Sequence, residues 1–170
     1  MTKARGPLHR VHFRRRRENK TDYVQRLALL KSGSPRLAVR KTNKSVLAQF
    51  IAFDEKGDKT LASACSADLR KQGFPGKCNT PSAYLAGFLA GKRALAKGVK
   101  KFVLDIGLNK ASKGGVVFAA LKGAVDAGLE TGFSQDVLPS KERMEGRHLK
   151  PEQATAFAQC LDKLKGRVDD

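Results

Sequence analysis

Four consecutive arginines, Arg14 to Arg17, stand near the start of the chain between Phe13 and Lys20. Guanidinium groups match phosphate oxygens in a bidentate way, and a neighbouring aromatic ring can stack on an unpaired base. The other basic residues of this first segment are Lys3, Arg5 and Arg10. Residues 1–20 show neither a helical nor a strand period and contain few hydrophobic residues, so they have little to fold against. We therefore expect a basic arm that binds nucleic acid; a solubilising tail or a localisation signal is the alternative.

The charge of the whole chain supports a polyanionic partner. The 170 residues include 34 Lys and Arg against 16 Asp and Glu, a net charge of +18. Residues 1–50 carry a net +12, residues 51–120 a net +7 and residues 121–170 a net −1. Such a charge attracts polyanions and argues against an acidic-ligand scaffold or a neutral metabolic enzyme. We expect the first half of the chain to meet nucleic acid and the last third to face protein or other neighbours on the solvent side.

Hydropathy and cysteine usage bear on the compartment. No run of 18 apolar residues could form a transmembrane helix, and the charged N-terminus lacks the apolar stretch of a secretory signal. The three cysteines, Cys65, Cys78 and Cys160, are odd in number and widely spaced, which fits a reducing compartment. We expect a cytoplasmic protein with no membrane partner.

Residues that could catalyse a reaction or hold a metal ion are sparse. No Cys-x-x-Cys pair exists, and Gly87-Phe-Leu-Ala-Gly91 has one residue too few between its glycines for a phosphate-binding loop. The rival class is a nuclease, whose metal ions need several converging carboxylates. Asp105 is the one carboxylate in or at the end of a predicted strand, while Asp54, Glu55 and Asp58 share one turn. We therefore expect no enzymatic activity, no cofactor and no metal site.

The elements that must position the basic residues begin with a short helix. Thr21 is expected to cap a helix over residues 22–32, in which Val24 and Leu27 share one face. An antiparallel meander is then predicted from three strands, over residues 36–41, 46–53 and 59–64. In the first strand, Leu37 and Val39 share one face and Arg36 and Arg40 share the other. The second of these strands is almost wholly apolar, which predicts that it is central and buried on both faces.

The second half of the chain predicts helices around one further strand. Thr80 and Pro81 begin a long helix whose small residues, Gly87 and Gly91 among them, would let it lie close to a sheet. The remaining predicted elements are a strand over 102–106, a helix from Val116 that stops at Gly128, and a last helix over about 151–165.

Together these patterns predict an α/β fold. The sheet is mixed, an antiparallel meander followed by a βαβα-like unit, and it is covered by helices and preceded by the basic N-terminal arm. We divide the chain into a basic arm over 1–20 that is expected to bind nucleic acid, RNA in particular if the resemblance described next holds, an α/β body over 21–128, and a C-terminal extension with a terminal helix over 129–170.

Several stretches resemble a known family. They are Phe13-Arg-Arg-Arg-Arg17-Glu-Asn-Lys20-Thr-Asp-Tyr23-Val-Gln-Arg26, Pro35-Arg-Leu-Ala-Val-Arg40-Lys-Thr-Asn43, Ala83 to Gly91, Leu104-Asp-Ile-Gly-Leu108, and Gly115 to Gly128. They resemble the large-subunit ribosomal protein family that binds 5S ribosomal RNA, the eighteenth protein in the bacterial count and the fifth in the eukaryotic count. The resemblance covers most of residues 7–150. It is closest to the archaeal type, because the arginine run goes past the bacterial pattern and the longer eukaryotic C-terminal extension is missing.

The resemblance implies a structural, non-enzymatic role in the central protuberance of the large subunit. The implied partners are 5S rRNA, the large-subunit rRNA and neighbouring ribosomal proteins, including a second 5S-binding protein. The residues onto which RNA contact is carried are Arg14, Arg15, Arg16, Arg17, Lys20, Tyr23, Arg26, Arg40, Lys41, Asn43, Lys44, Asn109, Lys110, Ser112 and Lys113, beside the arm residues Lys3, Arg5, Arg10 and Phe13. The last four of the first set form a basic loop before a helix N-terminus, a natural phosphate seat; a merely solvated loop is the alternative.

Other functions would leave different traces. A non-specific RNA-binding protein or RNA chaperone would bind unrelated RNAs equally well. A membrane-surface protein would need a helix with one basic and one broad apolar face, and no predicted helix has both.

Overall fold

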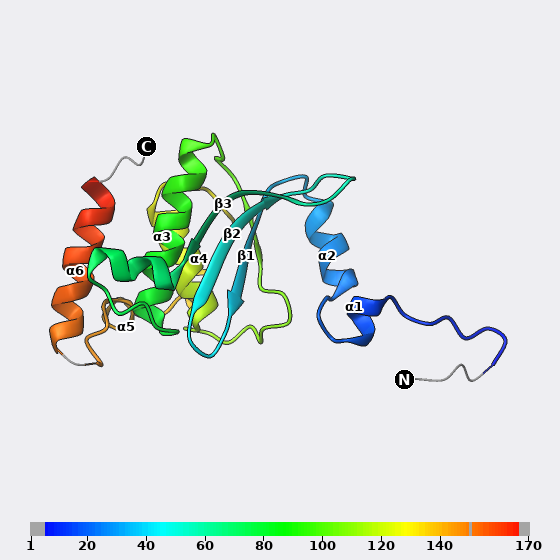
Figure 1. Ribbon diagram of the computed structural model, residues 1–170, viewed down its shortest axis with the longest axis horizontal. Helices are drawn as coiled ribbons and strands as arrows, with labels where there is room; N and C mark the ends of the chain where they lie inside the picture. Colours follow the sequence, from blue (N-terminus) through cyan, green and yellow to red (C-terminus); the bar gives the residue numbers. More distant parts are fainter. Residues whose placement is uncertain (1–5, 150, 167–170) are drawn as a thin grey trace.

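The structure, a computed structural model, describes residues 6–149 and 151–166 of the chain. At its centre is a four-stranded sheet with the strand order β3-β2-β1-β4 (Figure 1). The strands are β1 (Arg36–Lys41), β2 (Val46–Ala52), β3 (Lys59–Cys65) and β4 (Val103–Asp105). β2 pairs antiparallel with both β1 and β3, whereas β4 pairs parallel with β1. This arrangement confirms the predicted α/β fold with a mixed sheet.

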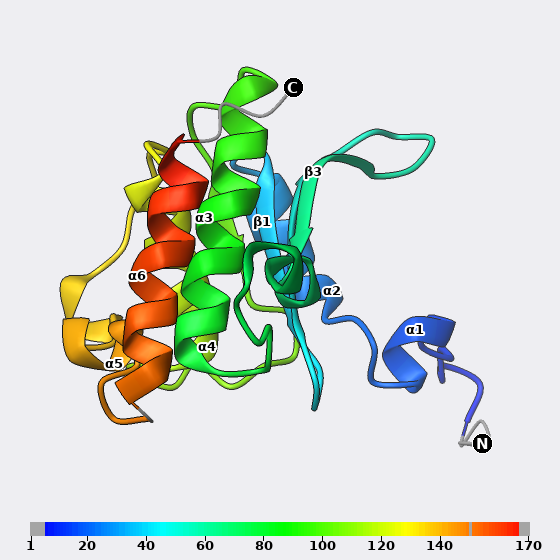
Figure 2. The same cartoon turned by 60° about the vertical axis from the view of Figure 1, so that its left-hand side comes forward.

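The helices are divided unequally between the two faces of the sheet. Those of the first 30 residues are α1 (Arg14–Arg17) and α2 (Tyr23–Leu30). Those that follow β3 are α3 (Thr80–Ala96), α4 (Val116–Asp126), α5 (Lys141–Glu145) and α6 (Pro151–Gly166), with the short 3-10 helices η1 (Ser66–Gln72) and η2 (Gln135–Val137). The four later α-helices gather on one side of the sheet, and α1 and α2 lie on the other (Figures 1 and 2).

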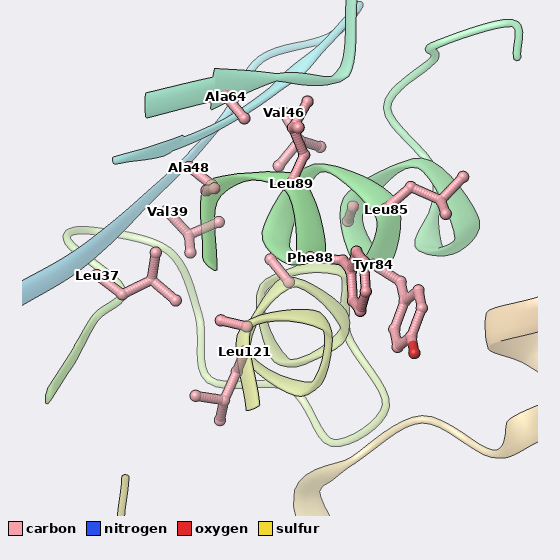
Figure 3. Close-up of a cluster of buried hydrophobic side chains, with 14 of the residues drawn as sticks. Leu37, Val39, Val46, Ala48, Ala64, Tyr84, Leu85, Phe88, Leu89 and Leu121 are labelled. Atoms are coloured by element: carbon pink, nitrogen blue, oxygen red, sulfur yellow. The ribbon is translucent and has the colours of Figure 1, made fainter. Parts of the chain in front are cut away.

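The core lies between the sheet and the later helices. Leu37 and Val39 of β1 point with Val46 and Ala48 of β2 towards α3 and α4, where they are buried (Figure 3). The alternation of β1 is as expected, because successive side chains of a strand point to opposite faces. The expectation that β2 is buried on both faces is wrong. Alternate residues of β2 are only half-buried, because no layer of later helices covers the second face.

Helix α3 is the most deeply buried helix of the described part of the chain, with 13 of its 17 residues buried. The glycines of α3 were expected to bring the helix close to the sheet. They lie against α4 instead. A Cβ at Gly87 would overlap the carbonyl oxygen of Ala120, and a Cβ at Gly123 of α4 would overlap that of Tyr84. The two backbones touch because each helix offers a glycine to the other.

The starts of α2 and α3 differ from the expected ones by one residue. Asp22, not Thr21, caps α2, since its Oδ1 accepts from the backbone N–H groups of Val24 (2.9 Å) and Gln25 (3.1 Å). Asn79 likewise caps α3 ahead of Thr80. In both cases the side chain that reaches the free N–H groups belongs to the residue that is still extended. The arm also contains one helical turn, α1, where no structure was predicted.

Candidate RNA-binding surface

The arm is exposed throughout residues 6–20, so its cations face solvent. Its conformation is held by contacts with the start of α2. The Phe13 ring, 72% exposed, lies with its centroid 5.2 Å from that of Tyr23, the planes tilted by 53°. The Nε of Arg15 donates to the hydroxyl of Thr21 (2.8 Å). The arm therefore presents guanidinium groups beside the exposed Phe13 ring and the half-buried Tyr23 ring, a combination that suits phosphates and unpaired bases.

Helix α2 is attached to the body by charge rather than by hydrophobic packing. None of its eight residues is buried, and Val24 and Leu27, on its apolar face, are 70% and 58% exposed. Its Arg26 instead donates from one terminal nitrogen to both carboxylate oxygens of Asp58, at 3.0 and 2.8 Å. Asp58 lies in the turn between β2 and β3, so this ion pair sets the helix beside the sheet.

Behind this pair stands a buried ionic network. Arg36 of β1, whose side chain is 4% exposed, reaches Asp58 with one terminal nitrogen (2.8 Å) and Asp105 of β4 with the other (3.2 Å). Asp105 also accepts from Arg40 (3.1 Å) and from the backbone N–H of Gly107 (2.8 Å). Two carboxylates thus hold three guanidinium groups, counting Arg26, and one positive charge is left over. The network connects α2, the β2–β3 turn, β1 and β4.

The acidic turn between β2 and β3 is occupied by cations of the protein itself. Beside the pairs of Asp58, Asp54 forms an ion pair with Lys59. The hydrogen bond from Lys59 lowers the pKa of the Asp54 carboxyl. In residues 6–149 and 151–166, no three His, Cys, Asp or Glu side chains gather in a way that could hold a metal ion.

Two further basic segments meet at one end of the sheet. The turn after β1 and the loop after β4 emerge at the same end, because the two strands run parallel. Lys41 at the end of β1 is exposed, and so are Asn43 and Lys44 of the turn. In the loop, the side-chain amide of Asn109 donates to the carbonyl oxygens of Ile106 (2.8 Å) and Val39 (3.4 Å). That contact fixes the start of the loop against β1.

Comparison of the sequence with known protein families identifies the family of this chain. Residues 8–101 and 96–134 match the family described as ribosomal large subunit proteins 60S L5 and 50S L18. The chain belongs to this L5/L18 family. The match covers the arm from residue 8, α2, the whole sheet, α3 and α4.

Archaeal proteins are among the similar relatives. The chain is 50% identical to the large ribosomal subunit protein uL18 of Methanoregula boonei, over 86% of this chain and 84% of that protein. It is 49% identical to that of Methanoculleus marisnigri over the same shares. With that of Korarchaeum cryptofilum it shares 47% identity over 94% of this chain and 80% of the relative. These matches confirm a structural protein of the large ribosomal subunit, of archaeal type, rather than an enzyme.

The structure places the expected contact residues of this L5/L18 family member in three groups. The arm and α2 hold Arg10, Phe13, Arg14, Arg15, Arg16, Arg17, Lys20, Tyr23 and Arg26; the end of β1 and its turn hold Arg40, Lys41, Asn43 and Lys44; the loop before α4 holds Asn109, Lys110, Ser112 and Lys113. Lys3 and Arg5 lie outside the described residues. Arg40 and Asn109 come together beside Val39, to whose carbonyl oxygen both donate.

Sequence reasoning missed the buried network of Arg36, Asp58 and Asp105. It put Arg36 on the same strand face as Arg40, which is right, but it did not predict that Arg36 pairs with two carboxylates. The signal that could have found the network is Asp105, a carboxylate at the end of an otherwise apolar strand, which needs a cationic partner when buried.

None of the helices in the described residues combines the length and the apolar composition that a membrane span needs.

Proposed function

We propose that this protein binds 5S rRNA and anchors it to the large-subunit rRNA in the central protuberance of the ribosome. One observation carries the proposal: the basic arm and α2 stand apart from the later helices, on the opposite side of the sheet (Figure 1). An RNA can therefore approach the cationic side chains without displacing any core element.

Binding rests on two kinds of contact. Exposed arginines of the arm neutralise phosphates, and the turn after β1 and the loop before α4 meet phosphates and 2′-hydroxyl groups. Because folded RNA is recognised chiefly by shape and unpaired loops, specificity comes from the joint placement of these segments rather than from a linear code.

The side of the later helices is left for protein neighbours, including a second 5S-binding protein. Its outermost helix, α6, has no net charge, because Glu152 and Asp162 are balanced by Lys163 and Lys165. Such a surface gains little from contact with phosphates. Cross-links from residues 151–166 that go mainly to RNA would contradict this assignment.

The test is direct binding to 5S rRNA and to an unrelated folded RNA of equal length, at about 150 mM salt, with and without residues 1–20. We expect a preference for 5S rRNA that is weakened when the arm is removed. Equal binding to both RNAs would contradict the proposal and indicate a non-specific RNA-binding protein or RNA chaperone.

A further inference from the structure

A cavity of about 420 Å³ opens between the arm, α2 and the sheet face that the later helices leave free. Its lining includes five cationic side chains, Arg15, Lys20, Arg26, Arg36 and Arg40, and three acidic ones, Asp22, Asp58 and Asp105. The lining therefore carries two net positive charges, or one when Glu18, which pairs with Lys20 at 2.9 Å, is counted. A cavity with this charge selects an anion, and its volume suits a small group rather than a double helix.

Not all of these cations are matched within the protein. Arg26, Arg36 and Arg40 share two carboxylates. The terminal nitrogens of Arg15 find no acceptor among the described residues, since only its Nε is bound, to Thr21. Moreover, the Nε of Arg36 is buried without a hydrogen-bond partner. A buried N–H without an acceptor is costly and rare in native proteins, so the acceptors within the protein do not fully satisfy the guanidinium of Arg36.

An aromatic surface adjoins the same cavity. Tyr23 lines it, and Phe13 lies against Tyr23 with most of its own surface exposed. Because Phe13 is 72% exposed, most of its ring surface remains free for a third planar group. Unpaired bases stack on such rings, whereas bases inside a helix are already stacked on one another.

We propose that this cavity binds one unpaired nucleotide of the RNA. Its phosphate lies among Arg15, Lys20 and Arg40, and its base lies against Phe13 and Tyr23. The inference rests on the proposed function, since it presupposes an RNA partner, but it assigns to that partner a flipped-out or single-stranded nucleotide. Arg26 and Arg36 are positioning residues, which hold α2 and the floor of the cavity through Asp58 and Asp105.

The stacking is tested by labelling the tyrosines. The chain contains two, Tyr23 and Tyr84, so 3-fluorotyrosine gives two ¹⁹F resonances, which Tyr84→Phe assigns. In the complex with 5S rRNA we expect the Tyr23 resonance to shift, because a stacked base changes the local magnetic field, while the resonance of the core residue Tyr84 stays in place. Inorganic polyphosphate, which has no bases, should move the Tyr23 resonance less than the RNA does. An unchanged Tyr23 resonance in a fully formed complex overturns the inference.

The phosphate contact is tested by substitution. Arg15→Gln and Lys20→Gln remove cavity charges, and Arg143→Gln and Lys71→Gln are matched controls. Arg143 is an exposed residue of α5 and Lys71 an exposed residue of η1, both away from the cavity. In wild type and variants, the affinity for 5S rRNA is measured at 50 and at 200 mM salt. For each phosphate contact that a cavity variant loses, we expect the drop in affinity between these two salt concentrations to be about 3.5-fold smaller than in wild type.

The two proposals fail in different ways. If wild-type protein does not prefer 5S rRNA, the proposed function fails. If that preference stands but the cavity variants keep the wild-type salt dependence, as the controls should, the nucleotide site alone is refuted.

Discussion

At the scale of single residues, Asp105 holds the largest share of the ionic network. Its side chain is 8% exposed and accepts from Arg36, Arg40 and the backbone of Gly107. Asp105→Asn keeps the shape of the side chain but leaves Arg36 with one carboxylate for a buried guanidinium. We expect a loss of about 3 kcal/mol in the free energy of unfolding, measured with urea, because breaking a buried ion pair strands its partner.

The control for this substitution is Lys101→Gln, which breaks a pair with Glu130 whose side chains are 76% and 71% exposed. Such exposed pairs contribute about 0–1 kcal/mol. A loss for Asp105→Asn no greater than that of the control would show that the network does not hold the sheet and α2 together.

The burial of Tyr84 leads to a prediction of how the free energy of unfolding depends on pH in the alkaline range. Burial, and then the hydrogen bond from its hydroxyl to Asp126 (2.9 Å), raises the pKa of the Tyr84 phenol. Above the ordinary tyrosine pKa of about 10, the unfolded chain releases this proton while the folded protein keeps it, so stability falls as pH rises. Between pH 9 and 11 we expect the unfolding free energy to fall further in wild type than in Tyr84→Phe. Equal slopes would contradict a buried, protonated phenol.

At the scale of elements, the contact between α3 and α4 depends on glycine. Gly87→Ala places a methyl group on the carbonyl oxygen of Ala120, and backbone on both sides prevents relief. Overpacking costs about 1–3 kcal/mol or more, and the gain of about 1 kcal/mol in helix propensity offsets only part of it. We expect a net loss of about 2 kcal/mol by thermal or urea unfolding. Gly132→Ala, with nothing within 4 Å of the added Cβ, should change stability little.

Helix α2 is predicted to open separately from the body. Arg26→Gln removes its ion pair with Asp58, and the helix has no buried residue to replace it. A loss of about 1 kcal/mol in local stability speeds amide hydrogen exchange roughly 5-fold. We expect this increase in residues 26–30 and no change in the amides of α3. Exchange that speeds up equally in both helices would mean that α2 opens only when the whole protein unfolds.

The elements that the sequence predicts well are those with a clear period. The alternation of Leu37 and Val39 and the start signal before α3 identified a strand and a helix close to their observed bounds. The helix α2 was also found, but its apolar residues Val24 and Leu27 are exposed, because burial depends on which element lies opposite. The sequence of a helix does not show which element packs against it. For the same reason, the sequence did not show that the glycines of α3 contact α4 instead of the sheet.

At the scale of the whole molecule, the uneven distribution of charge predicts a strong salt dependence. If the protein neutralises about 6–10 phosphates, its affinity for 5S rRNA should fall roughly 10³–10⁵-fold between 50 and 200 mM salt. Binding measured over this range gives the number of contacts from the slope. A slope near zero would contradict an electrostatic arm.

The sequence predicted the exposed residues of the candidate site but not the cavity. The arginine run and the basic turn could be found, because charged side chains in unpatterned segments face solvent. The cavity could not be found, because Arg15 and Arg40 are 25 positions apart along the chain and meet only through the sheet and the ion pairs of Asp58 and Asp105.

The long reach of the ionic network has a consequence for the order of synthesis. Arg26 finds Asp58 32 positions later in the chain, and Arg36 finds Asp58 22 positions later but Asp105 only 69 positions later. Because the N-terminus leaves the translating ribosome first, α2 and the cationic arm emerge before Asp58, and β1 emerges well before its parallel neighbour β4. The growing chain therefore lacks Asp105, the carboxylate that Arg36 and Arg40 share, until more than half of the protein has been made, and until then Arg40 is open to any polyanion near the exit.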